Sequence, residues 1–251
     1  MHQHVQHQVR QGVGIVGNVI SFGLFLSPIP TVFGFWKKKT VEEFHPWTFV
    51  FGILNCCLWI MYGAPKIHPD STLVWTINSV GLVLYVVYLS IYVWYAPKPK
   101  MLQVFGSVGA VAIVDVIVAL PVLLVVHVIK TRTLITGILA VIFNVCLYAG
   151  PLTVLGTVYR TKSVEYLPIW ICSANLANGI IWSTYALLSA PIDPMILTGN
   201  GIGTVLGLIQ IGLHVWYGSC WGNRKVASGG DDLKKPDKPS EVQLETVKIV
   251  V

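Results

Sequence analysis

Seven long apolar segments dominate this sequence, and they constrain the fold more than any other feature. Each has 17 to 26 residues, and a helix needs about 20 to cross the hydrocarbon core of a bilayer. In lipid such segments can only be helical, because nothing there pairs with an open strand edge. We therefore expect seven transmembrane helices, at residues 12–35, 47–63, 72–95, 102–127, 134–158, 169–188 and 195–217.

The composition excludes the main alternatives to a membrane protein. Only 11% of the 251 residues are Asp, Glu, Lys or Arg, against roughly 25% in a soluble domain. Hydrophobic residues make up 54%, and the mean hydropathy is +0.69. The chain has too little charge to cover a soluble core and too much apolar surface to stay disordered. The predicted fold class is an all-α integral membrane protein.

The sequence lacks the residue patterns of enzymes. It has no glycine-rich phosphate loop, no nucleophile elbow and no paired carboxylates within the apolar segments, and its five cysteines do not have metal-ligand spacing. We therefore expect neither an enzyme nor a metal or other cofactor. The net charge of +6 comes largely from basic residues in short loops. That placement indicates membrane topology rather than a nucleic-acid partner.

The basic residues also predict the orientation in the membrane. Positively charged loops stay in the cytosol. Nine basic residues fall on one predicted side: Lys37, Lys38, Lys39, Lys98, Lys100, Arg160, Lys162, Arg224 and Lys225. Four fall on the other: Arg10, Lys66, Lys130 and Arg132. We expect an extracellular N-terminus and a cytosolic C-terminus, with a disordered polar tail over 219–251.

An internal repeat organises the chain. Pro28 matches Pro151 and Trp59 matches Trp182, both at an offset of 123 residues. The same or nearly the same offset relates further positions: Lys39-Thr40-Val41-Glu42 to Lys162-Ser163-Val164-Glu165, Tyr62 to Tyr185, and Thr76, Asn78 and Gly81 to Thr198, Asn200 and Gly203. We expect three-helix units at 1–95 and 131–218, joined by one connector helix within 96–130. An odd connector makes the repeats parallel, and a path between such halves is the usual place for a transported substrate.

Asparagines lie inside the predicted helices, where an unpaired amide is costly. Asn55 pairs with Asn178 in the repeat, and Asn78 pairs with Asn200. A further one, Asn144, is the repeat partner of Ser21. Side-chain amides both donate and accept hydrogen bonds, as a neutral polyhydroxylated ligand requires. The alternative is that these amides form hydrogen bonds between helices and hold the bundle together.

Aromatic rings accompany these amides. Trp59 and Trp182 each follow one of the asparagines by four residues and share its helical face. A flat ring beside an amide suits the apolar face of a sugar ring.

Four prolines and one polar pair suggest that segments of the protein move. Four prolines near the predicted cytosolic helix ends can act as hinges, because proline removes a backbone donor; they are Pro28, Pro46, Pro151 and Pro168. On the opposite side, a hydrogen bond between Tyr62 and Asp193 would close the mouth. Asp115 lies in the middle of the connector helix, where an acid is costly, so a proton-coupling role stays open.

These motifs resemble those of the SWEET sugar transporters, with their two MtN3-type repeats. The resemblance covers residues 12–217 and is closest to plant members of the hexose type. It rests on Phe25-Leu26-Ser27-Pro28, Tyr148-Ala149-Gly150-Pro151, Leu54-Asn55-Cys56-Cys57-Leu58-Trp59, Arg160-Thr161-Lys162-Ser163-Val164-Glu165-Tyr166-Leu167-Pro168, Thr76-Ile77-Asn78-Ser79 and Asn200-Gly201-Ile202-Gly203.

The resemblance implies a bundle of three plus one plus three helices that exchanges sugar by alternating access without a coupling ion. It implies that Asn78 and Asn200 bind sugar hydroxyls and that Trp59 and Trp182 stack on the ring. The implied pocket lining is Ser21, Leu24, Asn55, Asn144, Leu147 and Asn178. The four prolines would form the inner gate, and Tyr62 with Asp193 the outer one. Homo-oligomers are implied as well.

The function expected from the sequence is a bidirectional facilitative hexose carrier, with glucose as the first candidate, in the plasma membrane. A vacuolar membrane stays open as a location. The first alternative is a sucrose carrier of the same fold, which would need a larger pocket. The others are a proton-coupled carrier that uses Asp115, and a seven-helix receptor, against which the parallel repeat argues.

Overall fold

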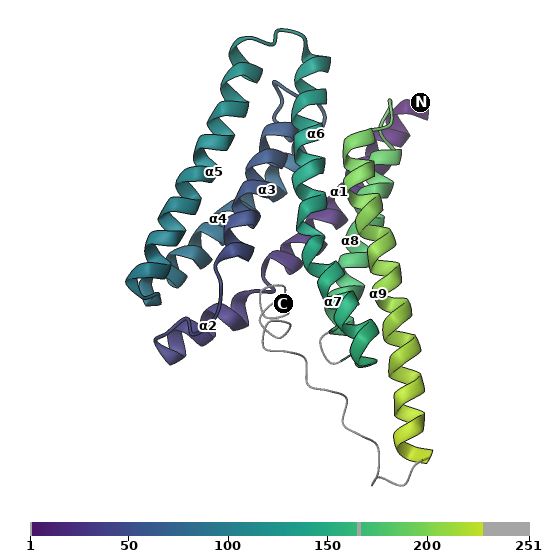
Figure 1. Ribbon diagram of the computed structural model, residues 1–251. Coiled ribbons are helices and arrows are strands. Elements are labelled where there is room, and N and C mark those ends of the chain that lie inside the picture. The colour runs from purple at the N-terminus through teal and green to yellow at the C-terminus, as the bar shows by residue number, and fades with distance from the viewer. Residues whose placement is uncertain (1, 165–166, 228–251) are drawn as a thin grey trace.

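The computed structural model describes residues 2–164 and 167–227. Over these ranges the chain forms nine helices and no strand (Figure 1). The helices are α1 (His2–Phe25), α2 (Ile29–Lys38), α3 (Trp47–Gly63), α4 (Thr72–Tyr95), α5 (Lys98–Leu124), α6 (Ile129–Leu147), α7 (Ala149–Thr161), α8 (Ile169–Leu187) and α9 (Pro194–Ala227). Glu165 and Tyr166 of the repeated motif, and tail residues 228–251, lie outside the described residues.

These helices form seven membrane-crossing segments, which confirms the predicted fold class. Five are long and apolar enough by length and composition: His4–Lys38, Thr72–Tyr95, Lys98–Leu124, Ile129–Thr161 and Pro194–Gly218. The other two are α3, a 17-residue apolar helix, and α8, which has 19 residues but is less apolar than the five. The first and fifth segments each consist of two helices, α1 with α2 and α6 with α7.

The two helix breaks are the main departure from the seven continuous helices predicted. α1 ends at Phe25, three residues before Pro28, and α6 ends at Leu147, four residues before Pro151. A proline ring clashes with the carbonyl four residues earlier and removes a backbone hydrogen bond, which kinks or breaks a helix at that point. Each break is bridged by a tighter turn, for example from the Tyr148 amide to the Val145 carbonyl at 3.0 Å.

Helix ends also differ from the apolar boundaries. α1 begins at His2 rather than residue 12, and α9 continues to Ala227, beyond the predicted start of the tail at 219. Residues 219–227 contain no proline and one glycine, so nothing in their composition stops the helix there. The predicted disordered tail therefore begins later than position 219 in this structure, and its disorder stays a prediction.

The two repeats pack against each other through equivalent helices. α1 contacts α8, and α3 contacts α6. Within the repeats, α4 packs on α1 and α3, and α9 packs on α6 and α8. The connector α5 packs mainly on α3. Figure 1 shows α5 at the edge of the bundle, joined to α6 by a short loop.

Two equivalent glycines allow the repeats to approach closely. A Cβ atom on Gly14 of α1 would lie 2.9 Å from the ring of Tyr185 on α8, and one on Gly137 of α6 would lie 2.8 Å from the ring of Tyr62 on α3. Gly14 and Gly137 are 123 residues apart, as are the two tyrosines. The repeat in the sequence therefore produces a pseudo-twofold contact between the halves.

The repeat extends to the ends of α2 and α7. Lys39 and Lys162 cap these helices in the left-handed conformation, with φ of 58° and 55°. Each ammonium lies within 5.3 Å of two ring centroids, those of Trp36 and Tyr95 in the first repeat and Tyr159 and Tyr217 in the second. These cation–π contacts join α2 to α4 and α7 to α9.

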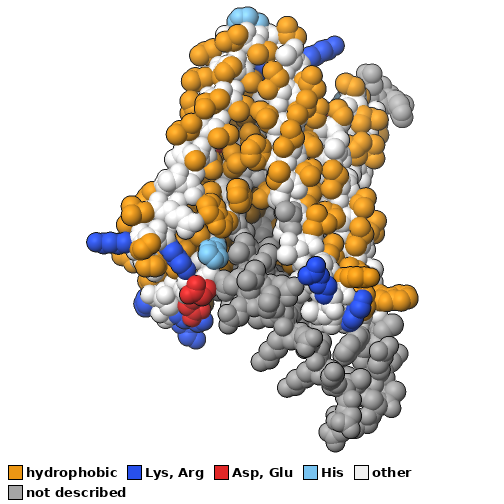
Figure 2. All heavy atoms as spheres, in the orientation of Figure 1, with side chains coloured by type: hydrophobic (Ala, Val, Ile, Leu, Met, Phe, Trp, Pro, Cys, Tyr) orange, Lys and Arg blue, Asp and Glu red, His pale blue; other side chains and the backbone are white. Residues whose placement is uncertain are grey.

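The surface fits a lipid environment. Figure 2 shows a face covered by hydrophobic side chains, with coloured charged residues near its two ends. On α5, Phe105, Ile113 and Ile117 are each more than half exposed. Contiguous apolar surface of this extent marks contact with a membrane rather than with water.

Candidate functional site

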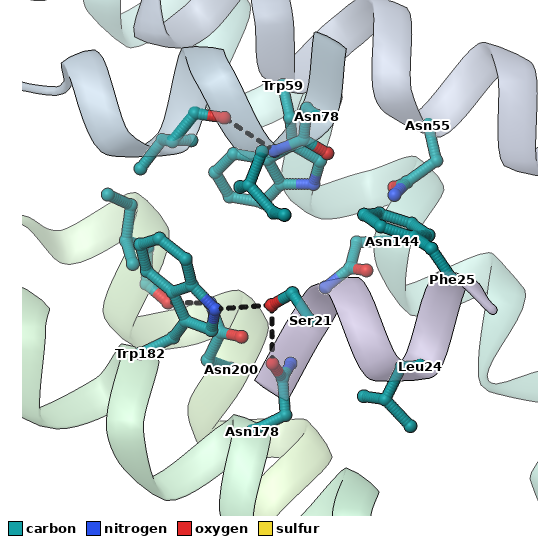
Figure 3. Close-up of a pocket in the computed structure, with 13 residues that line it drawn as sticks. Ser21, Leu24, Phe25, Asn55, Trp59, Asn78, Asn144, Asn178, Trp182 and Asn200 are labelled. Carbon is teal, nitrogen blue, oxygen red and sulfur yellow. Dashed lines mark hydrogen bonds between the residues drawn. The ribbon is translucent and has the colours of Figure 1, made fainter. Parts of the chain in front are cut away.

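A cavity of about 190 Å³ lies between the two repeats. Figure 3 shows side chains from both repeats around it. Its lining comes from α1, α3, α4, α6, α8 and α9: Ser21, Leu24, Phe25, Asn55, Trp59, Val74, Ile77, Asn78, Asn144, Asn178, Trp182, Ile196 and Asn200. Five amides and one hydroxyl among apolar and aromatic side chains are suited to bind a neutral polar molecule.

Asn78 and Asn200 are held in the same way. Each donates one amide N–H to the carbonyl four residues earlier on its own helix, Val74 at 2.8 Å and Ile196 at 2.9 Å. This bond fixes the side-chain direction and leaves the second N–H and the amide oxygen for another partner. The repeat therefore presents two equivalent amides to one cavity.

The two tryptophans are also equivalent. Trp59 and Trp182 line the cavity from opposite repeats (Figure 3), and each packs edge-on against the tyrosine three residues later, with ring centroids 5.5 and 5.3 Å apart. Tyr62 and Tyr185 are fully buried. Since these tyrosines brace the indoles, two rigid aromatic faces are available to a flat ligand.

The remaining polar groups break the symmetry. Between α1 and α8, the indole N–H of Trp182 donates to the Ser21 hydroxyl at 3.0 Å, which donates to the Asn178 amide oxygen at 2.6 Å. At the equivalent contact between α3 and α6, the Asn55 amide oxygen is buried without a hydrogen bond. A buried acceptor without a partner is costly, so a ligand hydroxyl that reaches Asn55 gains more than one that reaches the closed network.

Most of the residues predicted to line the site do so. Leu147, the last residue of α6, is the exception. Sequence reasoning missed Phe25, Val74, Ile77 and Ile196. Two of these, Val74 and Ile196, lie one helical turn before Asn78 and Asn200, so helical periodicity was the available signal.

The predicted outer contact is present. The Tyr62 hydroxyl donates to the Asp193 carboxylate at 2.7 Å in a buried position. The same carboxylate oxygen accepts the backbone N–H groups of Met195 and Ile196 and so caps α9. In the repeat-related position, the Tyr185 hydroxyl donates to the backbone carbonyl of Asp70 at 3.2 Å.

A histidine that sequence analysis did not single out joins this cluster. His68, in the loop between α3 and α4, stacks on the Tyr62 ring at 4.9 Å, and its Nε2 lies 3.7 Å from the free Asp193 oxygen. Burial, the largest cause, lowers the pKa of His68, and Arg10 acts in the same direction, while Asp193 and Asp70 oppose them. At neutral pH the imidazole is therefore uncharged.

This shift predicts a pH dependence. The unfolded chain protonates at about pH 6.5, above the lowered pKa of the folded state. The contribution of neutral His68 to the free energy of unfolding is thus complete above about pH 6.5 and is lost as the pH falls through the lowered pKa of the folded state. Between about pH 7.5 and about pH 5, wild type should lose more thermal stability than His68→Gln. Equal losses in a melting experiment would contradict this assignment.

The four predicted gate prolines all lie where helices begin. Pro28, Pro46 and Pro168 immediately precede α2, α3 and α8, and Pro151 is the third residue of α7. They mark points where the backbone hydrogen-bond ladder is interrupted, as a hinge requires. Their role as a gate stays a prediction.

Asp115 does not contribute to the cavity. It lies on α5 beside Cys57 of α3, and one of its carboxyl oxygens is buried without a hydrogen bond. The lining residues do not include it. Its placement gives no direct link between a proton and the ligand.

Comparison with known proteins decides the family. The family model described as "Sugar efflux transporter for intercellular exchange" matches twice, at residues 11–100 and 133–220. The chain belongs to the SWEET family. The double match places one SWEET unit in each predicted repeat and leaves most of α5 between them.

Named SWEET proteins match over most of the chain. "Bidirectional sugar transporter SWEET5" of Arabidopsis thaliana is 44% identical over 92% of this chain and 93% of its own length. "Bidirectional sugar transporter SWEET7b" of Oryza sativa subsp. japonica is 43% identical over 83% of this chain and 78% of its own. A structure titled as a eukaryotic SWEET transporter at 3.7 Å resolution covers 86% of this chain and 99% of its own, with a TM-score of 0.81 and 27% identity.

Proposed function

We propose that this chain is a bidirectional facilitative sugar carrier that works by alternating access between its two repeats. The observation that carries the proposal is the cavity between the repeats, with paired asparagines and paired tryptophans. Amides match sugar hydroxyls, and indoles match the apolar face of a sugar ring. Family membership and the names of its relatives as bidirectional sugar transporters support it further.

We assign roles to the site residues on this basis. Asn78 and Asn200 bind hydroxyls, and Trp59 and Trp182 stack on the ring. The Tyr62–Asp193 contact is the outer gate, and the four prolines allow the inner segments α2 and α7 to bend. The moving units are the repeats at 1–95 and 131–218, with 96–130 as the connector.

The preferred substrate is a hexose, with glucose as the first candidate. Three asparagines, Asn55, Asn144 and Asn178, line the cavity, and their amides occupy more space than serine side chains would. A volume of about 190 Å³ is below the roughly 300 Å³ at which pockets for drug-sized ligands begin. Both observations favour one sugar ring over a disaccharide.

We place the N-terminus outside the cell and the carrier in the plasma membrane, with the vacuolar membrane as the alternative. Helices of alternating direction put the C-terminal ends of α2 and α7 and the start of α5 at one end of the bundle (Figure 1). These ends carry Lys37 and Lys38, Arg160 and Lys98, as the positive-inside rule requires of a cytosolic side. We also propose that the chain assembles as a homo-oligomer in the bilayer.

Uptake of labelled glucose into proteoliposomes without a pH gradient tests the proposal. We expect flux with wild type and about tenfold less with Asn200→Ala, the scale of one well-placed hydrogen bond to a ligand. Ser79→Ala is the control, because this hydroxyl lies next to Asn78 in sequence but donates to the Trp75 carbonyl on its own helix and does not line the cavity. It should transport as wild type does.

Each other outcome selects a different conclusion. Uptake that survives in Asn200→Ala moves the binding site but keeps the carrier. Flux of sucrose in place of glucose selects the larger-substrate alternative. Flux that collapses with a protonophore and with Asp115→Asn selects proton coupling. Absence of any sugar flux overturns the proposal.

A further inference from the structure

The helix breaks in α1–α2 and α6–α7 each have an aromatic residue at their start. Phe25 is the last residue of α1, and Tyr148 directly follows α6. The two are 123 residues apart, so they occupy the same place in the two repeats. The Phe25 side chain packs against a glycine of α4, and the Tyr148 side chain packs against a glycine of α9.

The glycines give these aromatic residues their space. A Cβ atom on Gly81 would lie 2.5 Å from the Phe25 ring, and a Cβ atom on Gly203 would lie 2.6 Å from the Tyr148 hydroxyl. Gly81 and Gly203 lie three residues after the cavity asparagines Asn78 and Asn200, one helical turn away on the same face. In both repeats, therefore, a hinge residue packs one turn below a sugar-facing amide.

Only the second repeat adds hydrogen bonds to this contact. The Tyr148 hydroxyl donates to the backbone carbonyl of Gly199 at 2.8 Å and accepts an N–H from the Asn144 amide at 3.4 Å. Gly199 precedes Asn200, and Asn144 lines the cavity. Phe25 has no hydroxyl, and its backbone carbonyl instead accepts the Tyr88 hydroxyl at 3.0 Å. In the second repeat, hydrogen bonds of the Tyr148 side chain thus connect the cavity to the break between α6 and α7. The Phe25 side chain cannot form such bonds in the first repeat.

We propose that Tyr148 is a positioning residue that couples sugar occupancy to bending of the α6–α7 segment. This inference rests on the proposed function. A sugar hydroxyl that takes the Asn144 N–H competes with Tyr148 for it and changes how firmly the break is held against α9. A ligand shifts a conformational equilibrium only through contacts that differ between the two conformations. The Asn144 amide would provide such a contact, because it faces the cavity and also bonds to Tyr148 at the helix break.

The test is a kinetic comparison of Tyr148→Phe with wild type in glucose-transporting proteoliposomes. The phenylalanine keeps the ring and its packing, so only the hydroxyl is lost. We expect the maximal rate of net uptake to fall about fivefold and KM to stay within about twofold, since binding residues are intact but binding no longer drives the bend. Tyr159→Phe, which removes a hydroxyl from the 64% exposed tyrosine on α7, is the control.

A rescue experiment tests the contact itself. Gly203→Ala places a methyl group against the hydroxyl and should reduce uptake at least about fivefold. In Gly203→Ala/Tyr148→Phe the nearest ring carbon is 3.3 Å from that methyl group, so uptake should return to the level of Tyr148→Phe alone. Gly212→Ala, on the same helix with no atom within 4 Å of the new carbon, should match wild type.

The outcomes separate this inference from the proposed function. Sugar flux in wild type together with unchanged kinetics in Tyr148→Phe overturns the coupling and leaves the carrier intact. An equal rise in KM and loss of rate also overturns it, because that result assigns Tyr148 to binding. A double variant as inactive as Gly203→Ala overturns the contact. If wild type carries no sugar, the proposed function itself fails.

Discussion

Gly137→Val is expected to abolish transport and to lower the stability of the folded protein. The new Cβ would lie 2.5 Å from the Met195 side chain and 2.8 Å from the Tyr62 ring. Methionine can move aside, but the Tyr62 ring is buried and held by its hydrogen bond to Asp193. Overpacking of this kind costs about 1–3 kcal/mol, whereas the better helix propensity of valine returns only a few tenths. The cost of the clash therefore exceeds the gain in helix propensity, and the substitution lowers the stability of the fold.

The same reasoning applies to Gly14→Val in the other half. Its Cβ would meet Leu73 at 2.5 Å and Tyr185 at 2.9 Å. In detergent, both variants should melt below wild type, and their effects should add in the double variant because the two sites are on separate seams. Gly212→Val is the matched control and should be neutral or slightly stabilising, since nothing lies near that position. Wild-type melting and uptake in Gly137→Val would refute the close-contact argument.

These paired contacts explain why the sequence was informative about the site. The offset of 123 residues relates Asn55 to Asn178 and Trp59 to Trp182, and side chains at equivalent depth in pseudo-symmetric halves must face a common axis. The repeat therefore predicted which polar residues gather. The apolar lining was harder to find, because an isoleucine that faces a cavity looks the same in sequence as one that faces lipid.

The helix breaks and the asymmetry of the site could not be read from the repeat. Apolar segments carry no signal that separates a straight helix from one interrupted at Tyr148, and Pro28 and Pro151 marked only the neighbourhood. The repeat also treats Ser21 and Asn144 as equals, although one closes a hydrogen-bond network and the other bonds to Tyr148. Such differences depend on which partners lie within 3.5 Å, which only the packed structure determines.

His68 shows a third limit of sequence reasoning. A lone histidine in a short loop has no distinguishing pattern, and its importance comes from what surrounds it. The loop places it between the Tyr62 ring and the free oxygen of Asp193. The outer contact is therefore a cluster of residues rather than the single pair that the sequence indicated.

Asp193→Ala is expected to reduce transport more than any other change at the outer mouth, because this carboxylate has two functions. It accepts the Tyr62 hydroxyl and also caps α9, the helix that carries Asn200. Loss of a helix cap costs about 1 kcal/mol, and loss of a buried hydrogen bond leaves a penalty of about 1–3 kcal/mol. Together these amount to a change of roughly 30-fold or more in an equilibrium constant. Uptake and melting temperature should both fall.

Tyr62→Phe and Asp193→Asn separate the two functions. Tyr62→Phe removes the contact across the mouth but leaves the cap, so uptake should fall while the melting temperature stays closer to that of wild type. In Asp193→Asn the amide oxygen can still accept both the backbone N–H groups and the hydroxyl, so this variant should be the mildest. The expected order of uptake is wild type, Asp193→Asn, Tyr62→Phe and then Asp193→Ala. Equal uptake in Tyr62→Phe and wild type would show that Asp193 acts only as a helix cap. The outer gate would then have to involve another residue of the cluster, and His68 would be the next residue to replace.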